Sequence, residues 1–153
     1  MNQTEQLSRH FSLGEMIKTS VKNIANIPSH VHIENLRRLC GWLEMLREAW
    51  NQRYGEGDEP IVINSGYRSE AVNKAVGGVK GSNHLTGCAV DIRVSGLEQA
   101  LRYAVILLDI SDESQEAFDE LLLERGPRGN YWLHFAVRPP SQENRRRIRM
   151  IQT

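Results

Sequence analysis

The sequence predicts an α+β domain in which N-terminal helices pack on a mainly antiparallel sheet. Apolar side chains recur at three- and four-residue steps from Ile33 to Trp50, which is the pattern of a helix with one buried stripe. Later in the chain, residues 118–124 and 131–137 look like two strands joined by a turn that contains glycine and proline. Helices early and antiparallel strands late favour this class over a parallel α/β arrangement.

Length and composition restrict the class of protein. The 153 residues suit one domain, residues 1–153, of which we expect residues 1–10 to be frayed. With 40% hydrophobic residues, 25% charged residues and a formal net charge of zero, the chain lacks the charge of a general nucleic-acid or membrane-surface binder. Its two cysteines, Cys40 and Cys88, predict free thiols and no disulfide framework.

The N-terminus shows no targeting segment. It lacks the basic-then-apolar pattern of a signal peptide, and no apolar run reaches the about 20 residues that span a bilayer. We therefore expect a chain that is made in a cytoplasm without a signal peptide and has no membrane span.

Start and stop signals divide the first half of the chain. Residues 12–15, Ser-Leu-Gly-Glu, fit a capping box, in which the serine accepts from an early helix amide, and they predict a short helix through Ile17. The pair Pro28-Ser29 precedes the long periodic helix, which the polar, glycine-containing run 54–60 ends. Residues 61–63, Ile-Val-Ile, then predict a short buried strand.

The middle of the chain predicts one more short helix and a strand. Ser69 is the expected cap of a helix over residues 70–76, and the two glycines at 77–78 end it because glycine adopts positive φ readily. A loop follows, and residues 88–94 then predict a strand.

A second helix and a basic tail complete the predicted elements. Residues 95–98, Ser-Gly-Leu-Glu, repeat the capping-box pattern before a helical run. The buried face predicted for this helix consists of Leu97, Leu101, Ala104, Val105 and Leu108. The tail, with four arginines between 145 and 149, predicts a charged edge strand.

Three side chains far apart in the sequence have the chemistry of a catalytic zinc site, which uses three protein ligands and leaves a fourth position for water. His84 lies before a predicted strand, Asp91 within it and His134 on a later strand, so the three could converge. Alternation places Trp132 on the same strand face as His134. Spacing alone leaves a structural role open for each, because His-x6-Asp is not a self-sufficient metal motif.

Four short motifs surround these residues: SGYRS at 65–69, VGG at 76–78, S-x-H-x-x-G-x-A-x-D at 82–91 and W-x-H at 132–134. Together they resemble the zinc D-alanyl-D-alanine carboxypeptidase family of peptidoglycan peptidases, and more closely its small single-domain branch in bacteria and phages. FSLGEM at 11–16 and the pair Asn144-Arg145 also fit that branch. The resemblance therefore covers nearly the whole chain.

The resemblance implies a fold and a set of site residues. The fold is the α+β one shared with the hedgehog signalling domain. His84, Asp91 and His134 are implied as ligands of one Zn²⁺ ion, and Arg68 is implied to face the substrate. Hydrolysis of a peptide at such a site also needs a carboxylate that takes a proton from water and a cation or amide that stabilises the oxyanion.

The general base is where the sequence departs from many relatives. Many carry an acid three residues before the last histidine, but this chain has Tyr131 there, which cannot act as a general base. Other relatives place a glutamate at the end of the preceding strand, and Glu124 matches that position. Glu120 and Asp119 are the alternatives, and a Glu124 that is merely solvated at a strand end also stays open.

Three further residues are candidates for substrate contact. Arg68 offers a planar fork that binds a carboxylate with two hydrogen bonds, or it only ties its loop to the fold. Ser82 either orients the loop that carries His84 or bonds substrate, and the structural role is favoured. Trp132 is expected on the side of the site. His10, His30 and His32 lie in no motif, so we assign none of them to a metal.

The predicted function is a zinc metallopeptidase that cuts a D-amino-acid-containing bond in peptidoglycan stem peptides, as a D-Ala-D-Ala carboxypeptidase or an endolysin-type endopeptidase. The alternative is a non-catalytic, zinc-stabilised module that binds the cell wall or serves in a phage structure, because Tyr131 replaces an acid and fold does not determine function. We expect a monomer that acts at the bacterial cell wall, and a phage gene is one source that the resemblance allows.

Overall fold

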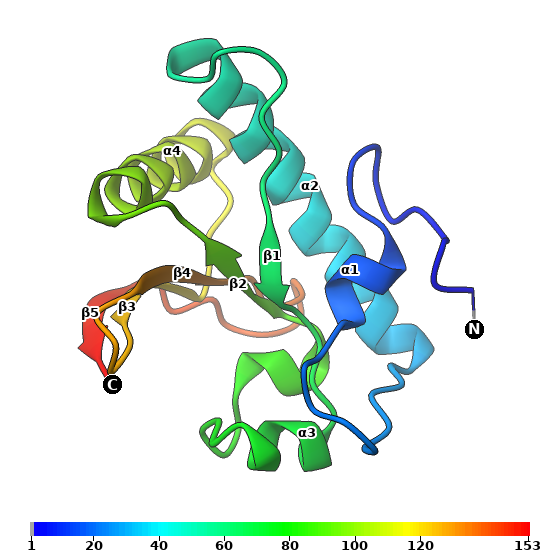
Figure 1. Ribbon diagram of the computed structural model, residues 1–153. Helices are drawn as coiled ribbons and strands as arrows, with labels where there is room; N and C mark the ends of the chain where they lie inside the picture. The colour runs from blue at the N-terminus through cyan, green and yellow to red at the C-terminus, as the bar shows by residue number, and fades with distance from the viewer. Residues whose placement is uncertain (1) are drawn as a thin grey trace.

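The computed structural model describes residues 2–153 and contains one five-stranded sheet with helices on both sides (Figure 1). Its elements are α1 (Leu13–Ile17), α2 (His30–Arg53), β1 (Ile63–Ser65), α3 (Glu70–Ala75), the 3-10 helix η1 (Asn83–Thr86), β2 (Ala89–Arg93), α4 (Leu97–Ser114), β3 (Glu120–Arg125), β4 (Tyr131–Ala136) and β5 (Arg147–Gln152). The strand order is β1-β2-β4-β3-β5, and every pair is antiparallel except β3 with β5. The predicted α+β class is confirmed.

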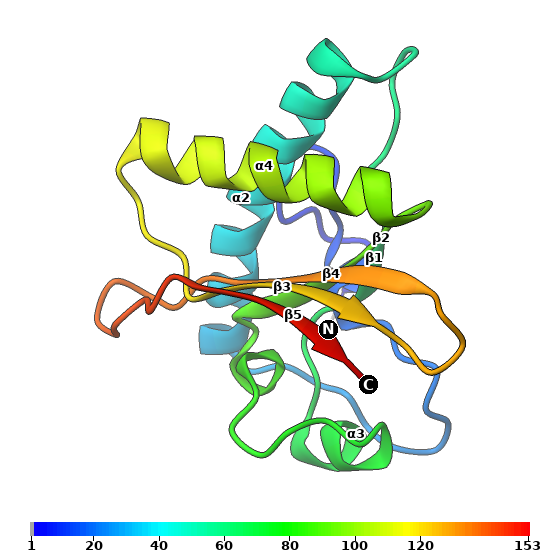
Figure 2. The same cartoon turned by 90° about the vertical axis from the view of Figure 1, so that its left-hand side faces the viewer.

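The two long helices cover one face of the sheet, and α3 lies on the other side (Figure 2). The helix-covered face carries alternate strand residues, all buried: Val90, Ile92, Leu121, Leu133 and Phe135. Phe135 packs against Trp42 of α2, with ring centroids 5.3 Å apart. Full burial of one such side chain contributes about 1.5–3 kcal/mol, so this layer is a main source of stability. The polar residues of the same strands are left to the opposite face.

The long helix begins and ends where the sequence predicts. The Ser29 side chain accepts from the His32 amide at 3.3 Å, and His32 Nδ1 accepts from the Ser29 amide at 3.1 Å, which completes a capping box. The short helices α1 and α3 likewise begin at the predicted caps, Ser12 and Ser69. No helix among residues 2–153 has the length and apolar character that a membrane crossing requires.

Residues 2–10, which we expected to be frayed, make specific contacts with the rest of the fold, while Met1 lies outside the described residues. Leu7 is only 7% exposed, and the Leu13 amide donates to the Glu5 carbonyl at 2.8 Å. Glu44 of α2 accepts from the Ser8 hydroxyl at 2.6 Å and from the His10 amide at 2.7 Å. This segment is held by contacts with a helix that lies more than 30 residues away in sequence, which local composition does not reveal.

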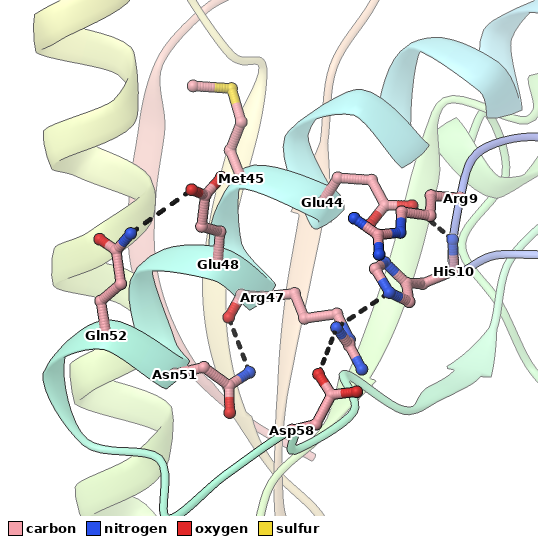
Figure 3. Close-up of a pocket in the computed structure, with 9 residues that line it drawn as sticks. All are labelled: Arg9, His10, Glu44, Met45, Arg47, Glu48, Asn51, Gln52 and Asp58. Atoms are coloured by element: carbon pink, nitrogen blue, oxygen red, sulfur yellow. Dashed lines mark hydrogen bonds and ion pairs between the residues drawn. The ribbon is translucent and has the colours of Figure 1, made fainter.

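The same contacts form one wall of a cavity of about 580 Å³ beside α2 (Figure 3). Arg47 lies 3.1 Å from His10 Nε2 and 2.9 Å from Asp58 Oδ1. His10 Nδ1 in turn lies 2.6 Å from Glu44 Oε1. The cavity lies where the N-terminal segment, α2 and the loop after α2 meet. Its charged groups pair with one another.

The strand predicted over 61–63 is displaced. Its pairing begins with Ile63 opposite Ile92 and continues to Ser65 opposite Asp91, with an irregularity between them. Ile61 is buried in the core, although it lies outside the strand pairing. Its apolar character therefore suggested a strand that begins two residues too early.

Two predictions for α4 are wrong. Its N-cap is Gly96, without a side-chain cap, and the Ser95 amide instead donates to Gln99 Oε1 at 2.8 Å. Of the predicted buried face, Leu97, Leu101 and Val105 are 41%, 50% and 53% exposed. The residues that are buried are Ala100, Tyr103, Ile106, Leu107, Ile110 and Ser111. The helix carries two neighbouring apolar stripes. The stripe that contains Tyr103 is buried because α4 packs on α2, where Tyr103 meets Trp50 edge-on at 5.0 Å.

Asp119 anchors the segment between β4 and β5. Its carboxylate is fully buried and accepts from Arg145 Nε at 2.9 Å and from the second Arg145 nitrogen at 2.7 Å. It also accepts from Asn83, the neighbour of His84, at 2.8 Å. Burial on its own raises the pKa of Asp119, but the hydrogen bonds from Arg145 outweigh burial and lower the pKa to about 2.

We predict that Asp119→Asn lowers the free energy of unfolding by about 2–3 kcal/mol at neutral pH, because it breaks a buried, hydrogen-bonded ion pair. The folded pKa lies below that of an unfolded aspartate, about 3.9, so the stabilisation is fully present above roughly pH 4 and is lost as the pH falls toward 2. Urea unfolding of both proteins at several pH values measures this.

The matched control is Asp112→Asn. Asp112 also pairs with a tail arginine, Arg146, at 3.0 Å, but its side chain is 70% exposed. An exposed pair contributes about 1 kcal/mol or less. Equal losses in the two variants, or an Asp119→Asn loss that does not shrink in acid, would contradict the anchoring role.

Candidate metal centre

The face of the sheet away from α2 and α4 brings the three candidate ligands together. Asp91 of β2 lies directly opposite His134 of β4, and His84 comes from η1, just before β2. One ligand atom of each residue lies within 4.8 Å of the other two, and all three side chains are buried. Residues that are 50 positions apart in sequence therefore form one compact group.

Each of the two histidines has one ring nitrogen that faces Asp91 and an outer nitrogen that faces away from it and is held by another residue. His84 Nδ1 lies 2.6 Å from the Gly66 carbonyl, which can only accept, so this nitrogen carries the proton. His134 Nε2 lies 3.0 Å from Glu120 Oε1. The inner nitrogens, His84 Nε2 and His134 Nδ1, each lie 3.2 Å from Asp91 Oδ1. Histidines that bind metals are oriented in this way, by a carbonyl or carboxylate on the far nitrogen.

The carboxylates around His134 stabilise positive charge at this point. Burial raises the pKa of Asp91, but His84 and His134 outweigh burial and hold the pKa of this carboxyl well below its usual range. Burial lowers the pKa of His134, but its hydrogen bonds with Asp91 and Glu120 raise the pKa to about 9. The donor set of two imidazoles and one carboxylate suits Zn²⁺, which takes such ligands in catalytic sites.

Glu124 and Glu120 lie on the same strand face but on different sides of the His134 ring. Glu124 Oε2 is 4.0 Å from His134 Nδ1, the nitrogen that faces Asp91. It accepts from Trp132 Nε1 at 3.1 Å. Burial and the charge of Asp91 raise the pKa of Glu124. The carboxylate predicted as the base is thus beside the candidate ligands.

The two alternative bases are occupied by other contacts. Glu120 Oε1 accepts from His134 Nε2 at 3.0 Å and from Asn83 at 2.7 Å, so it lies on the side of the ring away from Nδ1, the candidate ligand nitrogen. The hydrogen bond with His134 lowers the pKa of Glu120. Asp119 is fully buried in its pair with Arg145. The geometry favours Glu124 over both.

Arg68 makes contacts inside the protein with each of its guanidinium nitrogens. Nε donates to Ser65 Oγ at 3.0 Å, and the two terminal nitrogens donate to Asn73 Oδ1 at 3.3 Å and Asp91 Oδ2 at 3.1 Å. The side chain is 16% exposed. Arg68 therefore ties its loop to a candidate ligand and still reaches the surface beside it.

Ser82 and Trp132 also lie next to the group. The Ser82 hydroxyl accepts from the His84 amide at 3.1 Å and caps η1, which agrees with the structural role favoured from the sequence. Trp132 is half-buried and bonds Glu124, on the face of β4 that carries His134. Tyr131 alternates to the other face.

Sequence reasoning missed three contributors to this geometry. Glu120 was considered only as a base, although alternation with Glu124 already placed it on the face of His134. Asn83, which links Asp119 to Glu120, and the Gly66 carbonyl carried no local signal. A Cβ on Gly66 would collide with the Met16 carbonyl oxygen, so the close approach of α1 requires glycine there.

A profile of the peptidase M15 family matches residues 9–111. This match covers more than half of the chain, so the chain belongs to the peptidase M15 family, and the family predicted from the motifs is confirmed. The matched part includes His84 and Asp91 and ends before Glu124 and His134.

Among characterised proteins, the chain is similar to the zinc D-Ala-D-Ala carboxypeptidase of Streptomyces albus G. The two are 45% identical over 40 residues, which is 26% of this chain. The matched stretch spans only 16% of the length of the Streptomyces protein.

Proposed function

We propose that the chain is a zinc metallopeptidase that hydrolyses a D-amino-acid-containing bond in the stem peptide of peptidoglycan. The observation that carries the proposal is the convergence of His84, Asp91 and His134 with a carboxylate, Glu124, 4.0 Å from the His134 ligand nitrogen. Membership of a peptidase family and the similarity to a zinc D-Ala-D-Ala carboxypeptidase support the reaction and the substrate class.

His84 Nε2, one oxygen of Asp91 and His134 Nδ1 would hold the metal, because these atoms face one another while the outer ring nitrogens are bonded elsewhere. Zinc in such a site supplies Lewis-acid chemistry, which polarises a peptide carbonyl and makes water more acidic.

Glu124 takes the proton of the attacking water and passes it to the leaving amine. Burial raises the pKa of Glu124 toward neutral pH, where a general base is most effective. The hydrogen bond from Trp132 holds one carboxylate oxygen in place.

Arg68 and Trp132 are the proposed substrate contacts. The hydrogen bond to Asp91 places the positive charge of Arg68 at the edge of the candidate metal group. At this position the guanidinium would attract a substrate carboxylate or the oxyanion. The half-buried Trp132 ring offers an apolar surface beside Glu124. Ser82 acts indirectly, because its hydroxyl orients the turn that carries His84.

Digestion of purified cell-wall fragments, followed by mass analysis of the products, tests the proposal. Release of a terminal D-alanine identifies a carboxypeptidase, whereas larger peptide fragments identify an endopeptidase. A chelator-treated sample, with and without added zinc, is the control. Wall binding without turnover in the zinc-loaded protein would replace this proposal with the non-catalytic binding module.

A further inference from the structure

A row of residues crosses the whole sheet at the level of the candidate metal group. Paired positions run from Ser65 through Asp91, His134 and Leu122 to Arg149 on the edge strand β5. Paired positions share a sheet face, so Arg149 lies on the face that carries the candidate ligands. Arg147, two residues earlier, is paired with Glu120 on the same face.

These two arginines differ from their neighbours in the tail. Arg145 is paired with Asp119 and Arg146 with Asp112. Within residues 2–153, the side chains of Arg147 and Arg149 make no hydrogen bond or ion pair, and the Arg147 Nε is enclosed without an acceptor. Enclosed donors are nearly always bonded in folded proteins, so this nitrogen is available to an acceptor from outside the chain.

Protection of an exposed edge does not explain where the arginines are placed. Charged side chains commonly guard edge strands against pairing with other chains. The opposite face of β5 is also exposed, yet it carries Ile148 and Met150, which are 54% and 63% exposed. Within β5, the positive charges lie on the face of the candidate site, where Asp91, Glu120 and Glu124 would otherwise repel an anionic peptide.

We propose that Arg149, assisted by Arg147, forms a subsite for a carboxylate of the peptide substrate. This inference rests on the proposed function. Arg149 lies two strands from His134, or roughly 10 Å at the usual strand spacing. An extended peptide advances about 3.3 Å per residue, so the carboxylate belongs to a residue roughly three positions from the cleaved bond. The guanidinium fork binds such a group with paired hydrogen bonds.

Matched synthetic peptides test the subsite. Each pair contains the same D-Ala-D-Ala bond and differs only in a carboxylate or a carboxamide three residues away, on the amino side in one pair and on the carboxyl side in the other. We expect the wild-type protein to prefer the carboxylate in one pair by about tenfold in kcat/KM, a typical effect of one charged hydrogen bond. Arg149→Gln reduces this ratio to about one.

The control variant is Arg102→Gln, which removes the same charge from α4, on the other layer, where Arg102 pairs with Glu98. It retains the preference. Equal activity of the wild-type protein on both members of each pair would overturn the subsite. So would an Arg149→Gln protein that loses activity on both members together but keeps their ratio.

Binding measurements separate this inference from the proposed function. The dissociation constants of the same peptides for the zinc-loaded wild-type and Arg149→Gln proteins report the subsite without turnover. A carboxylate preference in binding that Arg149→Gln removes, with no cleavage by the wild-type protein, would support the subsite and overturn the peptidase. Cleavage by the wild-type protein without any preference for the carboxylate would support the peptidase and overturn the subsite.

Discussion

Glu124→Gln lowers kcat for wall peptides by about 10²–10⁴-fold, the contribution expected of a general base, while the protein keeps its zinc. The amide has nearly the shape of the carboxylate and can still accept from Trp132 Nε1, so the local structure is preserved. What is lost is the ability to take a proton 4.0 Å from His134 Nδ1, the proposed ligand nitrogen. Rate measurements on wall fragments, with zinc content determined on the same samples, check both parts.

Glu120→Gln is the comparison that separates a base from a positioning residue. Glu120 holds the outer nitrogen of His134, and loss of such a partner typically costs 10–100-fold in metal affinity or activity. Added zinc should therefore restore much of the Glu120→Gln activity and none of the Glu124→Gln activity. A Glu124→Gln protein that cleaves at the wild-type rate would transfer the role of base to another group.

The elements that the sequence predicts well are those whose signal is local. The long helix α2 has one apolar stripe and a serine cap, so its start and its buried face were both predictable. The hairpin of β3 and β4 follows from two apolar runs and a turn of suitable composition. The edge strand β5 is predicted by the arginines of the tail, because charged side chains are common on edge strands.

The errors arise where a distant partner decides. On α4 two apolar stripes compete, and only contact with Trp50 of α2 selects the one that contains Tyr103. The N-terminal segment is polar, so it looked frayed, yet Glu44 of α2 binds Ser8 and His10. Periodicity within a segment cannot report either contact.

The candidate site likewise has a part that local motifs predict and a part that depends on distant contacts. His84, Asp91 and His134 could be named from motifs, and the register of β2 with β4 then places Asp91 opposite His134. The second layer of contacts could not be named, because it depends on how separate elements meet. Glu120 holds His134 from β3, and Gly66 holds His84 from the loop after β1.

His84→Ala removes the zinc. The variant loses one of three proposed ligands, and its affinity for zinc should fall by more than the 10–100-fold that follows loss of an outer partner. Elemental analysis after dialysis should find about one zinc per chain in the wild-type protein and almost none in the variant. Zinc should also raise the melting temperature of the wild-type protein, because a ligand at 1,000 times its Kd stabilises a fold by about 4 kcal/mol.

The control is His30→Ala, since His30 is exposed at the start of α2 and far in sequence from the group. It should keep both the zinc and the zinc-dependent rise in melting temperature. A cooperative unfolding transition in His84→Ala would show that the variant is folded, so that the missing metal reflects the lost ligand. Stoichiometric zinc in a folded His84→Ala protein would refute the ligand set, and the proposed role of Glu124 would fall with it, because that role depends on the metal lying between these three side chains.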